Sequence, residues 1–106
     1  MTTRSVELPI PPADAWSRLK VAAQSIGRIE EAQEGARFLM LKARYGMNPV
    51  TVRVSVLTGL TDSTSVLDIE GRGQVVWGVD RVIDRLCAAV EVDGSEIPDA
   101  RSVRDS

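Results

Sequence analysis

The sequence predicts an α+β domain in which an antiparallel, curved sheet of about five strands carries two helices packed on one face. Three observations lead to this prediction. A short alternating segment precedes an amphipathic helix, four further alternating segments follow between turn signals, and a second amphipathic helix comes last. A run of strands bracketed by helices is typical of the α+β class, with the helices on one side of the sheet. The expected order is strand, helix, four strands, helix.

The first strand ends at a pair of prolines. Val6 and Leu8 alternate with polar residues over 3–10, which indicates a short strand. Pro11 and Pro12 cannot donate to a sheet ladder, so the strand cannot continue through them. The fixed φ of proline also suits the first turn of a helix. We therefore expect the first helix to begin at this corner.

The first helix is indicated by apolar residues at steps of three and four, which form one face. These residues are Trp16, Leu19, Ala23 and Ile26. Asp14 falls in the first turn, where a carboxylate is favourable at the positive end of the helix dipole. Gly27 is expected to end the helix, because glycine takes a left-handed C-terminal cap without strain.

Turn signals at 34–35, 46–49 and 59–63 separate four predicted strands, 28–33, 36–45, 50–57 and 64–70. The segment 50–57 alternates most regularly, with four valines pointing one way. In the segment before it, Leu39, Leu41 and Ala43 form one face, and Phe38 and Met40 form the other. Apolar residues on both faces suggest a central or partly covered strand.

A second helical stripe follows these strands, and we expect the helix to start near Gly78 because glycine lowers helix propensity. The stripe consists of Val79, Val82, Ile83, Leu86 and Val90. The remaining residues, 92–106, are acidic and have few large apolar side chains, so a disordered tail is predicted there. The expected organisation is one domain over 1–91 followed by that tail.

Composition narrows the class of protein. The chain has 106 residues, of which 43% are hydrophobic and 26% charged, which suits one globular domain. No apolar run approaches the roughly 20 residues of a membrane-spanning helix, and the first residues lack the pattern of a signal peptide. A single cysteine, Cys87, excludes a disulfide framework within the chain. We expect a cytoplasmic protein without an integral membrane segment.

Charge and the absence of histidine exclude further classes. The net charge is −2, with five acids and two arginines in 91–106, so residues 1–90 hold 11 bases and 10 acids. This near-neutral body disfavours nucleic-acid binding, which needs a clustered basic face. Without histidine, Ser-His and Cys-His catalysis and His-based zinc sites are closed to the chain. No metal site, cofactor or catalytic residue is predicted.

Two stretches carry a resemblance. "PIPPADAW" at 9–16 and "RGQVVWGVDRVIDRLCAAV" at 72–90 resemble the helix-grip superfamily, which includes START-type lipid-binding domains and polyketide cyclases (the SRPBCC group). The second stretch looks like the closing segment of small bacterial domains of this type. The same element order also fits the halves of TATA-binding proteins. The helix-grip resemblance implies an apolar ligand held between the last helix and the sheet.

The leading hypothesis is therefore a non-enzymatic module that binds a small apolar or amphipathic ligand in a groove between the C-terminal helix and the sheet. A permanently empty internal cavity of drug size would cost about 7 kcal/mol, most of the stability of such a domain, so an open groove is expected. The expected groove residues are Trp16, Leu41, Val52, Val54, Leu67, Ile69, Trp77 and Ile83. For Trp16 and Trp77, a structural role in fastening the helices to the sheet is favoured over ligand contact.

Two other groups are candidate surfaces. Lys42, Arg44 and Arg53 form a possible anion contact on neighbouring strands, although a solvated sheet surface balanced by acids is favoured. The apolar side chains of Phe38, Met40 and Val66 form a possible interface on the face away from the helices.

The alternative hypothesis is a protein–protein interaction or homodimerisation module that uses this face and binds no small ligand. A weaker alternative is a polyketide cyclase-like enzyme, which would need polar groups inside a pocket. Cys87 is interpreted as a small buried apolar residue.

Overall fold

The computed structural model describes residues 1–92 as two helices and five strands. The strands are β1 (Thr2–Leu8), β2 (Arg28–Gln33), β3 (Phe38–Tyr45), β4 (Asn48–Thr58) and β5 (Ser65–Gly73). The helices are α1 (Pro12–Ile26), between β1 and β2, and α2 (Val76–Val92), after β5. The predicted element order is confirmed. Of the tail predicted over 92–106, Val92 ends α2, and 93–106 lie outside the described residues.

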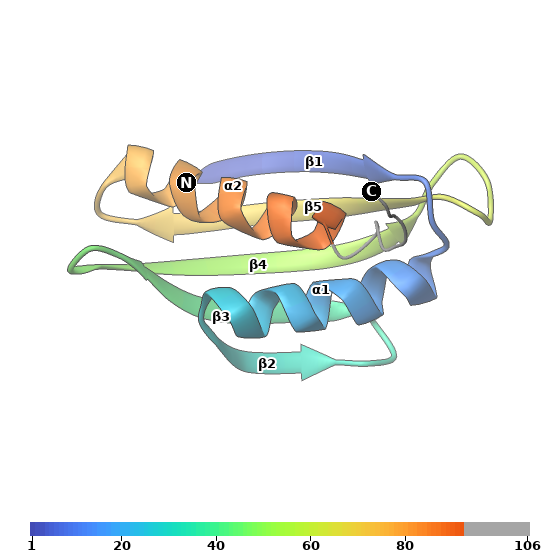
Figure 1. Ribbon diagram of the computed structural model, residues 1–106, viewed down its shortest axis with the longest axis horizontal. Coiled ribbons are helices and arrows are strands. Elements are labelled where there is room, and N and C mark those ends of the chain that lie inside the picture. Colours follow the sequence, from blue (N-terminus) through green and yellow to red (C-terminus); the bar gives the residue numbers. More distant parts are fainter. Residues whose placement is uncertain (93–106) are drawn as a thin grey trace, which may run out of the picture.

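All five strands belong to one antiparallel sheet with the order β1-β5-β4-β3-β2. β1 and β2 are therefore the two edge strands of the sheet, and β1 pairs with β5. The connection through α1 carries the chain from one edge to the other. Both helices lie on the same face of the sheet (Figure 1). This arrangement confirms the α+β class, and no helix within residues 1–92 covers the other face of the sheet.

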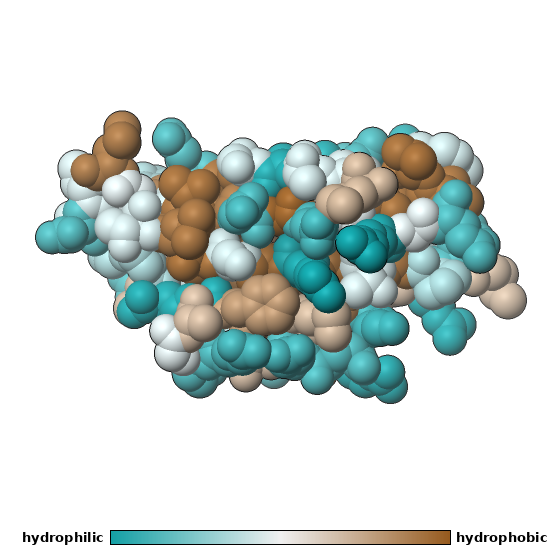
Figure 2. Space-filling view, turned by 180° about the vertical axis from the view of Figure 1, so that it is seen from behind, coloured by the Kyte–Doolittle hydropathy of each residue, from teal (hydrophilic) through white to brown (hydrophobic). Residues whose placement is uncertain are grey.

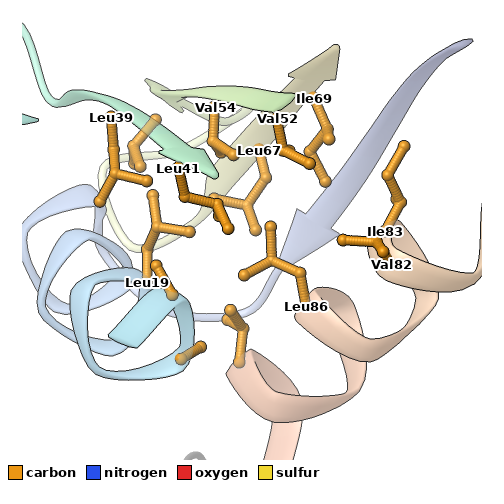
Figure 3. Packing of buried hydrophobic residues seen from close by; sticks show 14 of the residues in the cluster. Leu19, Leu39, Leu41, Val52, Val54, Leu67, Ile69, Val82, Ile83 and Leu86 are labelled. Carbon is orange, nitrogen blue, oxygen red and sulfur yellow. The ribbon is translucent and has the colours of Figure 1, made fainter. Parts of the chain in front are cut away.

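The core lies between the helices and the covered face of the sheet, and Figure 3 shows its side chains converging from both layers. Strict alternation on β4 sends Val50, Val52, Val54 and Val56 into this layer, each with 5% exposure or less. Leucine and isoleucine side chains from β3, β5 and both helices complete one continuous cluster. The core is apolar throughout, except that Ser65 is also fully buried.

The corner between β1 and α1 forms as the prolines require. Pro11 is the extended residue before the helix, with φ −62° and ψ 156°, and Pro12 is the first helical residue. The Pro11 carbonyl accepts the first helical hydrogen bond from the Ala15 amide at 3.0 Å. Asp14 lies in the first turn, as expected.

Gly27 ends α1, but the predicted left-handed cap is wrong. Its φ is −165°, an extended conformation that any residue adopts. Glycine is needed there for space, because a Cβ atom at this position would lie 2.3 Å from the Lys42 carbonyl oxygen on β3. The chain therefore passes against the sheet directly after the helix.

The last strand and last helix extend beyond their predicted limits. β5 continues to Gly73, and glycine stands at 71 and 73 because a Cβ atom at either position would collide with Val79 of α2. α2 begins at Val76, so Gly78 lies within its first turn rather than at its start. A Cβ atom at Gly78 would lie 3.2 Å from Tyr45, so this glycine lets the helix approach β3 closely.

Candidate functional site

Of the eight residues predicted to line a groove, all except Trp77 lie in the closed core. Six of them have exposures of 0–1%: Leu41, Val52, Val54, Leu67, Ile69 and Ile83. A side chain with no accessible surface adjoins no space wide enough for a water molecule. A ligand between α2 and the sheet would therefore have to open this layer, which the described structure holds shut.

Trp16 is 5% exposed and fastens α1 to the turn between β2 and β3. Its Nε1 donates a hydrogen bond of 2.9 Å to Glu34 Oε1, and Lys20 Nζ lies 3.0 Å from Glu34 Oε2. The same ammonium lies 5.5 Å from the indole ring centroid, within cation–π range. The hydrogen bond from Trp16, followed by that from Lys20, lowers the pKa of Glu34. These contacts give Trp16 a structural task.

Trp77 differs from Trp16, because 60% of it is exposed. The buried stripe of α2 starts at Val79, and Trp77, two residues earlier, falls on the other side of the helix. Its ring packs edge-on against Tyr45, with centroids 5.0 Å apart and an interplanar angle of 85°. Trp77 therefore does not fasten α2 to the core, and it lies outside the predicted groove.

A cleft of about 280 Å³ lies at one end of the sheet, where β1 runs into the corner before α1 and β5 begins. We call it the end cleft. Its apolar lining comes from Leu8, Pro9, Leu60 and Val66. Leu60, on the loop between β4 and β5, is 95% exposed and has almost no protein contact over its side chain.

Ser65 also lines the end cleft, and its hydroxyl lacks a partner. The residue is 0% exposed, and Ser65 Oγ is a buried polar atom without a hydrogen-bond partner in the described structure. An unpaired buried hydroxyl carries a desolvation cost of about 1–3 kcal/mol. Because Ser65 Oγ has no accessible surface, a molecule in the end cleft would reach it only after the surrounding side chains moved.

A second concavity, of about 510 Å³, lies where the chain leaves α1 and passes beside β3. Arg28, Lys42, Arg44 and Pro49 contribute to its lining, and we call it the basic concavity. Arg28 Nη2 lies 2.6 Å from Glu30 Oε2. Within the described residues Lys42 and Arg44 take part in no ion pair.

Of the three residues predicted as an anion contact, two line this concavity and the third lies apart. Arg53 lies on β4 two residues beyond Thr51, the partner of Lys42, and so farther from the hairpin turn. Its Nη1 lies 3.9 Å from Glu70 Oε1 on β5. Arg72, which the prediction did not include, pairs with Thr51, and Thr51 also pairs with Lys42. The register thus brings Arg72 into the same row across the sheet as Lys42 and Arg28.

The open face carries the residues predicted as an interface, and Figure 2 shows hydrophilic side chains between patches of apolar ones. Phe38, Met40 and Val66 all lie on this side and are half-buried, since they alternate with the inward residues of β3 and β5. Leu57, which the prediction missed, pairs with Val66 and is 49% exposed. Arg53 pairs with Met40, so charged and apolar side chains alternate across the face.

Two titratable groups beside α2, the Cys87 thiol and the Arg4 guanidinium, have shifted pKa values. Cys87 is half-buried, and burial raises the pKa of its thiol. Arg4 on β1 donates a hydrogen bond of 2.6 Å from Nη1 to Asp84 Oδ1 on α2, the helix that also carries Cys87. This hydrogen bond raises the pKa of Arg4. Over the described part of the chain, no three histidine, cysteine or acidic side chains gather as metal ligands. In the same part, neither helix has the length and apolarity needed to cross a bilayer.

The sequence signal for the end cleft was present but weak. The turn signal at 59–63 predicted the loop between β4 and β5. It did not predict that this loop lies beside Pro9, on the other side of the end cleft. Their meeting depends on the pairing of β1 with β5, and this pairing joins residues that are far apart in the sequence. The buried serine follows the alternation of β5, but its lack of a partner is a property of the packed structure alone.

Comparison with known proteins gives likeness at the level of the fold. No family model matches the chain, and no curated protein matches its sequence. A solved structure of a protein from Nitrosospira multiformis is similar with a TM-score of 0.53 and 14% identity. The match covers 90% of this chain and 96% of that one.

Two other solved structures are similar with lower scores. A conserved protein from Geobacillus kaustophilus has a TM-score of 0.47 and 12% identity, and the match covers 86% of this chain and 92% of that one. The di-domain ARO/CYC StfQ from the steffimycin biosynthetic pathway has a TM-score of 0.45 and 11% identity. That match covers 85% of this chain and 43% of that one. At these identities the likeness concerns the fold alone, and the five-stranded sheet with two helices on one face is compatible with the helix-grip fold.

Proposed function

We propose that the chain is a non-enzymatic, helix-grip-like module that binds a small apolar or amphipathic molecule, and that the molecule occupies the end cleft. The observation that carries this proposal is the mainly apolar end cleft, which has the exposed Leu60 in its lining and the buried, unpartnered Ser65 hydroxyl next to it. A ligand with a short apolar body would fit this lining, and one hydroxyl or carboxyl group on it would pair with Ser65 Oγ once binding opens the wall of the cleft.

The size of the cleft limits the ligand. A volume of about 280 Å³ is near the lower end of the range for drug-sized molecules, so a smaller compound is expected. The exposed Leu60 side chain is available to cover its apolar part. Burial of Leu60 against a ligand would remove apolar surface from water, at roughly 25 cal/mol per Å².

The test is a heteronuclear NMR titration with 1-octanol, followed by the same titration on variants. We expect amide shifts over 7–9, 59–60 and 64–66, with little change at core residues. Ser65→Ala should weaken binding roughly fivefold, because one hydrogen bond is worth about 1 kcal/mol. The same variant should fold as stably as the parent chain or more so, since it removes an unpaired group.

Leu60→Asp should weaken binding without loss of stability, because Leu60 has little contact in the free protein. Val21→Asp is the matched control, since Val21 is an exposed apolar residue on α1 outside the cleft lining. Equal affinity in the Ser65→Ala and parent chains would refute the role of the hydroxyl. Shifts concentrated at Leu41, Val52 and Ile83 would instead support the original prediction that the ligand binds between α2 and the sheet.

A second candidate function is homodimerisation through the open face. It is favoured by the diagonal placement of Leu57 beside Phe38, which joins the predicted residues into an apolar strip. Phe38→Asp and Met40→Asp should abolish a dimer without unfolding the chain. A single monomeric species of the parent chain at about 100 μM in sedimentation equilibrium would reject this candidate, because an interface of standard size holds partners more tightly.

A further inference from the structure

The end of the molecule opposite the end cleft combines exposed apolar side chains with basic ones that form no ion pair within residues 1–92. It contains the turn between β3 and β4 and the first turn of α2, which lie at the same end in Figure 1. We call it the hairpin end. Met47 is 87% exposed, Val76 63% and Trp77 60%. Single exposed apolar residues are ordinary, but three at one end of a small domain form a candidate contact surface.

The apolar tips of the hairpin end are held in place by the fold. Tyr45 packs against the Trp77 ring and contacts the backbone of α2 at Gly78. Gly46 has a φ of +63°, the left-handed conformation that this tight turn requires, and Met47 follows it. Trp77 and Met47 are therefore presented by two ordered turns that touch one another through Tyr45.

Basic residues surround these tips on both sides of the molecule. Segments 40–50 and 71–85 together contain five bases and two acids, a balance of +3. On the open face the bases are Lys42, Arg44 and Arg72, and the first two line the basic concavity. On α2, Arg81 and Arg85 follow Trp77 at steps of four, so they lie on its side of the helix.

The opposite end carries the reverse charge. Segments 7–14, 31–37 and 58–65 together contain five acids and one base, a balance of −4. Leu60 is more exposed there than any tip at the hairpin end. Exposed apolar side chains therefore occur at both ends of the molecule, but only at the hairpin end do the surrounding segments carry a net positive charge.

From this combination we infer that the hairpin end docks on an anionic lipid bilayer, with Trp77, Met47 and Val76 entering the interface and the basic residues contacting headgroups. Tryptophan prefers the bilayer interface, where an apolar ring and a polar N–H are both accommodated. Neither signal is strong alone, and peripheral binding is stable when apolar insertion and basic charge act together. The charge complementarity selects a bilayer surface rich in acidic lipid.

The inference is tested by co-sedimentation of the full chain with vesicles of POPC containing about 30% POPS, against vesicles of pure POPC. We expect binding to the acidic vesicles alone, and a strong decrease between about 50 and 500 mM NaCl as the charges are screened. Tryptophan emission should shift to shorter wavelength, since Trp77 is exposed and Trp16 is already buried. Equal binding to both vesicle types, or none to either, would overturn the inference.

Matched variants separate this surface from a general effect of charge. Arg44→Gln should weaken vesicle binding roughly fivefold, because one basic residue near the surface contributes about this factor. Met47→Asp should weaken it further, by removing an inserted side chain and adding a negative charge. Arg37→Gln and Leu60→Asp make the same changes at the opposite end and should have no comparable effect. Thermal melting of each variant reports whether it folds.

Two results would refute the lipid assignment even if Arg44→Gln weakened binding. One is that Met47→Asp binds acidic vesicles as well as the parent chain does, which would leave charge without insertion. The other is that inositol hexakisphosphate at equal charge binds the parent chain more tightly than the acidic vesicles do and binds the Arg44→Gln variant tenfold more weakly, which would indicate a soluble anion as the ligand. Failure of the 1-octanol titration leaves the inference standing, because the two surfaces share no residue.

Discussion

Neighbouring residues of β3 meet two different environments. Leu39 and Leu41 point at the helices and are fully buried, while Phe38 and Met40 lie between them on the open face and keep contact with water. The same strand therefore supplies the core with one row and the surface with the other. Substitutions on the covered side should change the free energy of unfolding, and those on the open side should change what the protein binds.

The largest expected difference between the two faces comes from adjacent positions. Leu41→Ala should lower the free energy of unfolding by about 2–5 kcal/mol, since it leaves a cavity in a closely packed layer. Met40→Ala should change it by less than about 1 kcal/mol, because its side chain lies on the open face. Urea unfolding followed by circular dichroism measures both. Equal losses would mean that a further layer covers the open face in solution.

A second comparison concerns close approach rather than burial. Gly27→Ala should destabilise the protein by about 1–3 kcal/mol, because the new Cβ would meet the Lys42 carbonyl oxygen at 2.3 Å. Gly35→Ala is the control, since no atom lies within 4 Å of the corresponding Cβ. There the reduced freedom of the unfolded chain should leave stability unchanged or slightly higher. If both variants melt together, the end of α1 is not held against β3 as described.

The sequence predicted local pattern well and contact between distant segments poorly. Alternation on β4 and the steps of α1 depend on neighbouring residues, so the order of elements and the covered face followed from them. The exposure of Trp77 and the length of β5 depend on how α2 sits against Tyr45 and Gly71. Such packing has no local signal. The role assigned to Gly27 failed for the same reason, because a nearby carbonyl and not the helix geometry requires glycine there.

The predicted sites divide along the same line. Alternation correctly separated the inward residues of β3, β4 and β5 from the outward ones, but it could not say how tightly the inward ones pack. Whether a groove exists is decided by a few ångströms between layers, and that distance is a sum over all core side chains. Arg72 and Leu57 joined the candidate surfaces through strand register, which the turn signals left undetermined.

The smallest predicted effect is at the rim between the two faces, where Glu34 accepts hydrogen bonds from Trp16 and Lys20. These contacts lower its pKa, so the folded protein binds the ionised form more favourably than the unfolded chain does. The resulting stabilisation is complete above the unfolded pKa of about 4.3 and is lost as pH falls through the lower, folded value. Glu34→Gln should therefore lower Tm by a few degrees at most at pH 7, and by less at pH 3.

Thermal melts at both pH values measure this difference, and Asp62→Asn, on the loop between β4 and β5, is the control for a general change in charge. A Glu34→Gln loss that stays constant between pH 7 and pH 3 would mean that the carboxylate charge contributes nothing. The effect is expected to be small because Glu34 is exposed and water competes for its oxygen atoms. Trp16 itself is held by its burial in the core, so the indole N–H needs only a nearby acceptor, and the amide oxygen of glutamine remains one.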